Sequence, residues 1–180
     1  GMGAALCMAL CSTLIRTYAT HYPALPALAI NTVNDRILTD SRGDMFVTVF
    51  FGVLEPDTGR LRYVNAGHNP PYLFSFKKSK PVESLHPTGM ALGVLPNTHW
   101  EQKMIKFTPG DMRLLYTDGV TEAQDTAGRF FGPDRLLKIG RALHGRSAAE
   151  VQDTVLTEVK CFCGDASQAD DIALMTIVRK

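Results

Sequence analysis

The chain has 180 residues, of which 45% are hydrophobic and 21% charged, and its formal net charge is +1 at pH 7. This length and composition fit one globular domain with a sizeable core, and they exclude a disordered segment. The near-neutral charge gives no electrostatic basis for binding nucleic acid, and no polybasic run is present to bind a membrane surface. The longest apolar stretch, Met2–Cys11, is too short to cross a bilayer, which takes about twenty residues.

Two helices are predicted at the start of the chain, over residues 4–20 and 27–40, with Pro23 and Pro26 in or next to the linker. Residues 4–11 are apolar on every side of such a helix. We therefore expect this helix to be buried on most of its surface.

A series of strands follows the two helices. Pro56-Asp57-Thr58-Gly59 is a turn, because Pro presets φ and Gly accepts a positive φ, and the lysine-containing segment 77–80 reads as a solvated turn. Short turns between strands indicate antiparallel pairing. The predicted strands cover residues 45–55, 61–67, 72–76, 99–107 and 112–118.

Two further helices and a last strand complete the pattern. The helices are predicted over 131–143 and 147–162, the second opened by a capping box of Ser147 and Glu150, and the strand over 172–178. Helices grouped at either end of antiparallel strands predict an α+β fold, in which helices cover a sheet.

The four cysteines do not form a recognisable metal motif. Cys7 and Cys11 are four residues apart, Cys161 and Cys163 only two, and no His lies close by. We interpret them as reduced cysteines that pack as small hydrophobic residues, in preference to a zinc site. With no signal peptide in the sequence, we expect a cytoplasmic location.

Acidic residues stand at two strand boundaries. Asp118 follows an apolar strand and precedes Gly119, and the pair Asp170-Asp171 directly precedes the strand 172–178. Adjacent strands would bring these carboxylates together, where they repel one another unless a hard cation is bound. Oxygen ligands without Cys or His favour Mg²⁺ or Mn²⁺, and Gly119 lets the backbone approach such an ion closely.

A simpler interpretation of the same acids stays open at this point. Asp118 then begins an ordinary turn, since Asp-Gly is a common turn signal, and Asp170 or Asp171 caps a helix or lies on the surface. His68 is interpreted as part of a structured turn in preference to a general acid. Glu122 is predicted to start a helix.

Together, these segments make the sequence recognisable. It resembles the SpoIIE/RsbU-type branch of the metal-dependent protein Ser/Thr phosphatase (PPM) family, in chain order and along nearly its whole length. The most specific parts are NAGHNPP, YTDG and DDI. The matching segments are residues 44–74, 89–94, 107–136 and 164–178, and the GMGAALCMAL start resembles the helix after the family's first metal-binding loop.

The resemblance implies an αββα sandwich of antiparallel sheets flanked by helices, with a pair of Mn²⁺ or Mg²⁺ ions at one end of the sheets. It implies hydrolysis of phosphoserine or phosphothreonine on a protein by a metal-activated water, without a phosphoenzyme. The usual substrate in this branch is a phosphorylated anti-anti-sigma factor, a STAS-domain protein that regulates a bacterial sigma factor. Such domains usually follow a sensor, receiver or coiled-coil segment in a longer chain.

The family's site residues carry over to four positions. Asp118 and Asp170 match metal ligands, Gly119 shapes the loop, and Asp171 is expected to lie one layer further from the metal. Arg129 and Arg135 are expected on solvated faces, with contact to a phosphoprotein as the alternative. Reading the acids alone, without the resemblance, leaves some other divalent-metal hydrolase as a weaker alternative.

One departure from the family concerns the start of the chain. The family's first metal loop, of the type D-V-S-G-x-G, precedes the helix at which this chain begins, so residues 1–180 are expected to lack that loop, its bridging aspartate and the first strands. We then expect one weakly held metal at best, little or no activity from this chain alone, and self-association through exposed sheet edges. The alternative function is a non-catalytic module with a degenerate phosphatase fold that docks a STAS-type partner.

Overall fold

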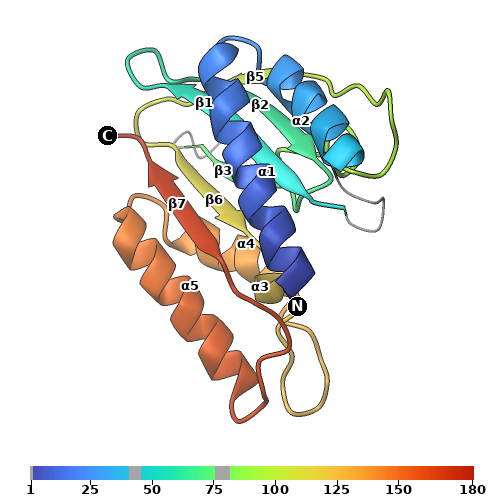
Figure 1. Ribbon diagram of the computed structural model, residues 1–180. Coiled ribbons are helices and arrows are strands. Elements are labelled where there is room, and N and C mark those ends of the chain that lie inside the picture. The colour runs from blue at the N-terminus through green and yellow to red at the C-terminus, as the bar shows by residue number, and fades with distance from the viewer. Residues whose placement is uncertain (1, 41–45, 76–81) are drawn as a thin grey trace. The chain divides into compact units, whose positions relative to one another are not determined.

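The structure is a computed structural model that describes residues 2–40, 46–75 and 82–180. The chain divides into two compact units, the first made of residues 1–68 and 86–107 and the second of residues 69–85 and 108–180. Each unit has its own antiparallel sheet, its own helices and its own hydrophobic core, and each is described by itself (Figure 1).

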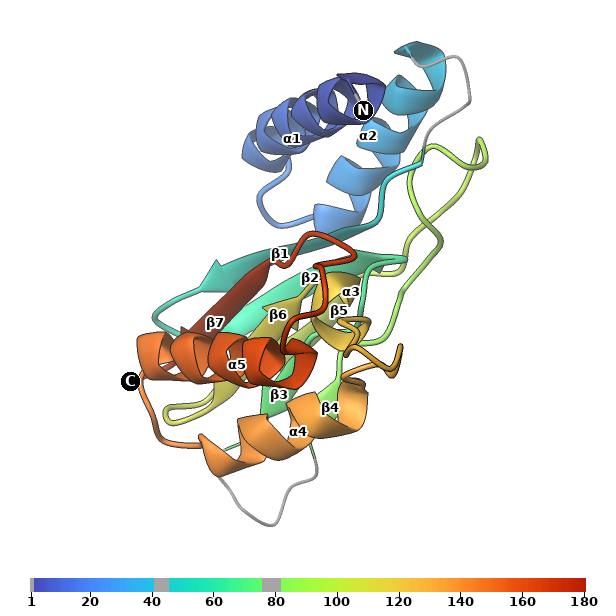
Figure 2. The ribbon, with the colours of Figure 1, turned by 90° about the horizontal axis from the view of Figure 1, so that it is seen from below.

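The first unit is a sheet of strand order β1-β2-β5 with two helices packed beside each other (Figures 1 and 2). The β1–β2 hairpin closes between Glu55 and Arg60, and Gly59 takes a φ of 68° in its turn, as predicted. Helix α2 contacts β2 and β1, which places its apolar residues over the sheet. The elements are α1 (Met2–His21), α2 (Pro26–Asp40), β1 (Val49–Glu55), β2 (Arg60–Ala66) and β5 (Lys103–Lys106).

The prediction that the helix over 4–11 is buried on most sides is wrong for its described side chains. Met8 is 67% exposed and Leu10 is 36% exposed, whereas Cys11 is buried. Among the side chains of α1 that the structure describes, from residue 8 onward, one stripe that includes Cys11 and Tyr18 at a spacing of two helical turns joins the core of the first unit. An all-apolar sequence does not identify which face of a helix is covered.

The turn interpretation of His68 agrees with its hydrogen bonds. Its backbone N–H donates to Asn65 Oδ1 at 2.8 Å, and Asn65 is fully buried. The Nδ1 atom of the His68 ring lies 3.4 Å from Thr48 Oγ1. These contacts give the NAGH segment a structural explanation.

The second unit is a sheet of strand order β4-β3-β6-β7 in which every neighbouring pair is antiparallel. Helix α5 contacts β7, and α4 contacts both α5 and β3. The predicted capping box at Ser147 and Glu150 is confirmed. The elements are β3 (Tyr72–Phe74), β4 (Glu83–Ser84), β6 (Met112–Tyr116), α3 (Asp118–Thr121), α4 (Pro133–Ala142), α5 (Ala148–Cys163) and β7 (Leu174–Val178).

The core of the second unit lies between its helices and its sheet. Val151, Val155 and Val159, spaced four residues apart on α5, are each at most 1% exposed and form one apolar stripe. A Cβ on Gly140 would fall 2.2 Å from Phe74 Cζ, so the missing side chain lets α4 approach β3 closely. These contacts hold the sheet whose strand ends carry the predicted metal ligands.

The α+β class with antiparallel sheets is confirmed. β2 has the predicted length but lies one residue earlier, and the other predicted strands are shorter than predicted. β4 and α3 were not predicted, and the segment 77–80 lies outside the described residues. No helix in the described ranges is long and apolar enough to cross a membrane. The edge strands are β1 and β5 in one sheet and β4 and β7 in the other, and self-association stays a prediction.

The chain differs from prediction where β6 ends. The strand stops at Tyr116, and Asp118 is the first residue of α3 instead of the last residue of a strand. Glu122 does not start a helix: its N–H donates to Asp118 O at 2.7 Å and closes the single turn of α3. Thr117 is the last residue before α3 whose backbone bonds toward the β7 side, through its N–H to Ala173 O at 3.0 Å.

Candidate metal centre

The pairing of β6 with β7 brings the predicted acids to one edge of the second sheet. Tyr116, at the end of β6, lies opposite Leu174, at the start of β7. Thr117 N–H donates to Ala173 O at 3.0 Å and extends the ladder by one residue. Asp118 therefore follows the last paired residue on one strand, and Asp170-Asp171 precede the first on the other, so the two acidic segments lie at the same end of the β6–β7 pair.

The side chain of Thr117 ties the two segments together. Its Oγ1 accepts from Ala173 N–H at 2.9 Å and donates to Asp171 O at 3.0 Å. Because one hydroxyl bonds two backbone groups of the acidic segment, it fixes that segment against the end of β6. Nothing in the local sequence around Thr117 marks these partners, which are more than fifty residues away.

Gly119 allows a close approach of the same two segments. A Cβ at this position would fall 2.4 Å from Asp171 O and 3.3 Å from Asp170 O. Real Cβ atoms do not come so near a carbonyl oxygen, so any side chain here would push α3 and the acidic segment apart. Gly119 shapes the loop as predicted, through contact with backbone oxygens.

The two predicted ligands are exposed, and each uses one carboxylate oxygen locally. Asp118 Oδ1 accepts from Gly119 N–H at 3.0 Å, and Asp170 Oδ1 accepts from Asp171 N–H at 2.7 Å. Gln168 Nε2 donates to Asp170 O at 2.8 Å and holds the backbone that carries this ligand. Asp171 is also exposed, and its carbonyl oxygen, not its carboxylate, makes the contacts to Thr117 and Gly119.

The carboxylate oxygens of Asp118 and Asp170 are suitable ligands for a hard divalent ion, because Mg²⁺ and Mn²⁺ bind carboxylate oxygens. Within the ranges 2–40, 46–75 and 82–180, however, no group of three or more His, Cys, Asp or Glu side chains is placed to hold a metal. Asp118 and Asp170 stay predicted ligands. An ion held by both would need water or other groups to complete its coordination.

A stacked aromatic pair connects the end of β6 with the neighbouring strand β3. The rings of Tyr72 and Tyr116 are stacked with their centroids 5.4 Å apart, and Tyr116 is 5% exposed. Burial, and then a hydrogen bond with Tyr72, raises the pKa of the Tyr116 phenol far above its usual range. This phenol stays protonated at neutral pH and adds no charge to the acidic edge.

The loop after α3 is held by Asp125. Its Oδ1 accepts from the backbone N–H groups of Ala127 and Arg129, both at 2.9 Å, and its Oδ2 accepts from Arg129 Nε at 2.7 Å. These bonds to Arg129 hold the pKa of the Asp125 carboxyl below its usual value. Arg135 donates to the carbonyl oxygens of Phe130 and Phe131. Both arginines are exposed, as expected, and each also has a structural partner that the sequence did not indicate.

The cysteines correspond in part to the sequence prediction. Cys11, Cys161 and Cys163 are free thiols, but only Cys11 is buried. Cys161 is exposed at the end of α5 and does not pack as a small hydrophobic residue. The end of α5 leaves that side chain facing solvent, whereas Val159 faces the core.

Replacing Thr117 by Val tests the tie between the two segments. Val keeps the shape but removes both hydrogen bonds, so we expect the free energy of unfolding to fall by about 1 kcal/mol, measured by urea denaturation. Thr126→Val is the control, because the structure records no hydrogen bond for that exposed hydroxyl with a described residue. Equal stability of the two variants would contradict the role assigned to Thr117.

Comparison with solved structures identifies the class of protein. The SiaA-PP2C domain of Pseudomonas aeruginosa matches all of this chain and 72% of its own chain, with a TM-score of 0.85 and 17% sequence identity. The RsbU and RsbW domains of Rv1364c from Mycobacterium tuberculosis match all of this chain and 50% of their own, with a TM-score of 0.82 and 24% identity. The fold is therefore that of a PP2C-type phosphatase domain.

Comparison of sequences identifies the family. The family model described as Stage II sporulation protein E (SpoIIE) matches residues 1–180. Protein IcfG of Synechocystis sp. is 36% identical over 153 residues, covering 84% of this chain and 24% of IcfG. Phosphoserine phosphatase RsbU of Bacillus subtilis is 26% identical over 182 residues, covering 99% of this chain and 53% of RsbU. The chain belongs to the SpoIIE family, within the SpoIIE/RsbU branch of the PPM phosphatases, and it spans about a quarter and about half of the length of these two relatives.

Proposed function

We propose that this chain acts in the hydrolysis of phosphoserine or phosphothreonine on a protein, with Mn²⁺ or Mg²⁺ held by Asp118 and Asp170. The observation that carries the proposal is the junction of β6 and β7, where Thr117 and Gly119 fix the two acidic segments against each other. This chain, which contains the junction, belongs to a family of phosphatases.

Each residue of the junction has a distinct part in this proposal. Asp118 and Asp170 bind the ion through carboxylate oxygens, while Thr117 and Gly119 set the spacing between the segments that carry them. Asp171 orients water beside the ligands through its exposed carboxylate. A bound divalent ion supplies positive charge to the phosphoryl oxygens and lowers the pKa of water in its coordination shell.

The substrate that we propose is a phosphorylated STAS-domain protein of a sigma-factor pathway, in the cytoplasm of a bacterium. The relative named Phosphoserine phosphatase RsbU supports this substrate class, and so does the structure in which RsbU and RsbW domains occur together. We also propose that a sensor or receiver segment controls the domain in a longer chain, since this chain spans only 53% of RsbU.

A second candidate is a non-catalytic module that binds the phosphoprotein without hydrolysing it. The observation that favours it is the incomplete ligand set, since no group of three metal-binding side chains occurs among the described residues. Such a module would regulate its partner by occupancy alone.

Phosphate release distinguishes the two candidates. The full native protein and the 180-residue chain are each incubated with the phosphorylated STAS-domain protein of the same organism, in Mn²⁺ or in EDTA. We expect Mn²⁺-dependent release by the native protein and little by the chain alone, because no group of three or more metal-binding side chains occurs among the described residues. If the native protein binds the phosphoprotein but releases no phosphate from it, the protein is the binding module instead.

A further inference from the structure

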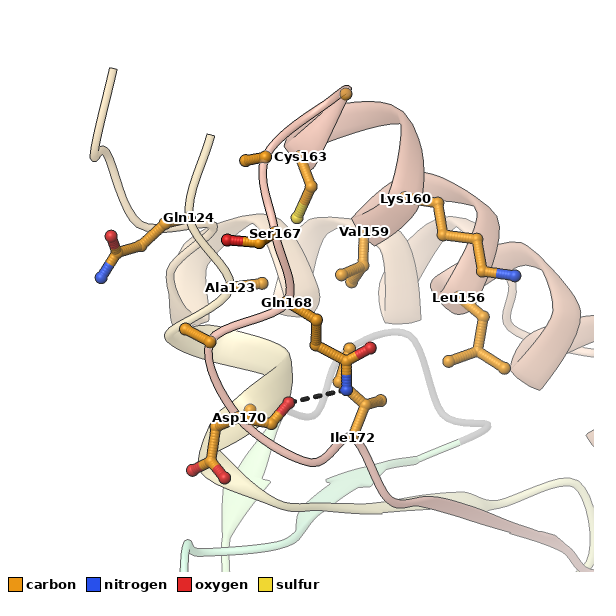
Figure 3. Close-up of a pocket in the computed structure, with 14 residues that line it drawn as sticks. Ala123, Gln124, Leu156, Val159, Lys160, Cys163, Ser167, Gln168, Asp170 and Ile172 are labelled. Carbon is orange, nitrogen blue, oxygen red and sulfur yellow. Dashed lines mark hydrogen bonds between the residues drawn. The ribbon is translucent and has the colours of Figure 1, made fainter. Parts of the chain in front are cut away.

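The second unit contains a cavity of about 320 Å³ between the second half of α5 and the segment 164–172 (Figure 3). We propose that this cavity is a binding site for a small organic carboxylate with an apolar body, such as an arylalkyl carboxylate. Its lining includes Ala123, Leu156, Val159, Lys160, Cys163 and Ile172. The lining also includes Gly119 and Asp170, so the cavity borders the candidate metal centre, although the Asp170 carboxylate points away from Gln168 and Ile172 (Figure 3).

The floor of the cavity is apolar. Val159 is 1% exposed and belongs to the core of the second unit, and Leu156 and Ile172 lie beside it (Figure 3). A volume of about 320 Å³ is at the lower end of the range of small-molecule pockets, which suits a ring or a short branched chain. These apolar side chains would therefore contact the apolar part of the ligand.

The charge expected of the ligand follows from the charged side chains at the rim of the cavity. Lys160 is the one cationic side chain in the lining, and the structure records no ion pair between it and another described residue. Asp170 is the one acid in the lining, and its carboxylate points away from Gln168 and Ile172 (Figure 3). A carboxylate on the ligand can pair with Lys160 without facing the Asp170 carboxylate.

Gln168 connects the cavity with the candidate metal centre. Its side chain lines the cavity, and its Nε2 donates to Asp170 O at 2.8 Å (Figure 3). A ligand packed against Gln168 would hold the backbone of the segment that carries Asp170. The site is thus placed to stabilise that segment whether or not the domain is catalytic.

Cys163 provides a test that does not depend on phosphatase activity. Its half-buried thiol lines the cavity, whereas Cys161 is exposed two residues away. Both lie in one tryptic peptide, from the residue after Lys160 to Arg179. The variants Cys161→Ser and Cys163→Ser each leave a single thiol in this peptide, so alkylation by N-ethylmaleimide can be followed at either position by mass spectrometry.

The probe is 3-phenylpropionate, and the matched neutral compound is 3-phenylpropionamide. We expect the carboxylate at about 10 mM to slow alkylation of Cys163 by about tenfold, as for a ligand with a Kd of about 1 mM that excludes the reagent. We expect weaker protection by the amide and no protection of Cys161. In Lys160→Gln, the carboxylate and the amide should protect Cys163 equally.

Three results would overturn the proposal. They are unchanged alkylation of Cys163 in the presence of the carboxylate, equal protection by the carboxylate and the amide in the chain with Lys160, and equal protection of Cys161 and Cys163. Circular dichroism of each variant shows whether the fold is intact, and Cys163→Ser supplies the reference rate because its remaining thiol, Cys161, is exposed and outside the cavity lining.

Discussion

Replacing Gly119 by Ala is expected to disrupt the candidate metal centre. Inside a helix, Ala is favoured over Gly by about 1 kcal/mol, so propensity alone predicts that this change stabilises α3. The added Cβ, however, would fall 2.4 Å from Asp171 O, and a backbone oxygen cannot rotate away as a side chain can. We expect the free energy of unfolding to fall by about 2 kcal/mol as α3 and the acidic segment separate.

The same change is expected to weaken Mn²⁺ binding by about tenfold or more, because it moves Asp118 relative to Asp170, and ligand positions matter within a fraction of an ångström. Calorimetric titration with Mn²⁺ measures the binding, and urea denaturation measures the stability. Gly128→Ala is the control: a Cβ there meets no atom within 4 Å, and its φ of 75° costs only about 1 kcal/mol. A Gly119→Ala variant with unchanged stability and unchanged Mn²⁺ affinity would show that the close approach has no importance for the site.

Removing the charge of either predicted ligand is expected to abolish most of the Mn²⁺ affinity. In Asp118→Asn and Asp170→Asn, one carboxylate is lost, but Oδ1 can still accept the bond from the next backbone N–H. We expect the affinity for Mn²⁺ to fall about a hundredfold in each variant, together with any Mn²⁺-dependent phosphate release. Stability in the absence of metal should change little, since both side chains are exposed.

Two further substitutions make this prediction specific. Asp165→Asn changes another exposed acid in the segment after α5 and should leave Mn²⁺ binding unchanged. Asp171→Asn should have a smaller effect than Asp170→Asn, since Asp171 is predicted to lie further from the metal. If Asp118→Asn and Asp170→Asn bind Mn²⁺ as tightly as the unaltered chain, these residues are not the ligands.

The sequence predicted most of the regular elements because their patterns are local. Helix α5 was predicted from a capping box and apolar spacing, and it begins one residue after Ser147, as a capped helix does. The adjacency of Asp118 and Asp170 followed from two apolar strands flanked by acids. Their role as ligands, by contrast, comes from the family resemblance and stays a prediction.

The features that were missed depend on partners far away in the chain. The bonds of Thr117 to Asp171 and Ala173 span more than fifty residues, and a hydroxyl group carries no mark of which backbone it will bind. The covered face of α1 depends on α2, which an all-apolar helix does not indicate. The short helix α3 is a single turn, too short to give a periodic pattern.

The division of the chain between its two units has a consequence for the order in which the protein is made. The residues assigned here to the first unit have all left the ribosome once residue 107 has emerged, whereas β3 of the second unit emerges well before its partner β6. Until then β3 has only the two-residue strand β4 beside it, and so small a hairpin is not stable by itself. Strand β7 follows only after α3, α4 and α5. Among the described strands, the β6–β7 edge that carries Asp118 and Asp170 is therefore assembled after the others, and a nascent chain stalled between α4 and β7 would carry the elements of the first unit but no candidate metal centre.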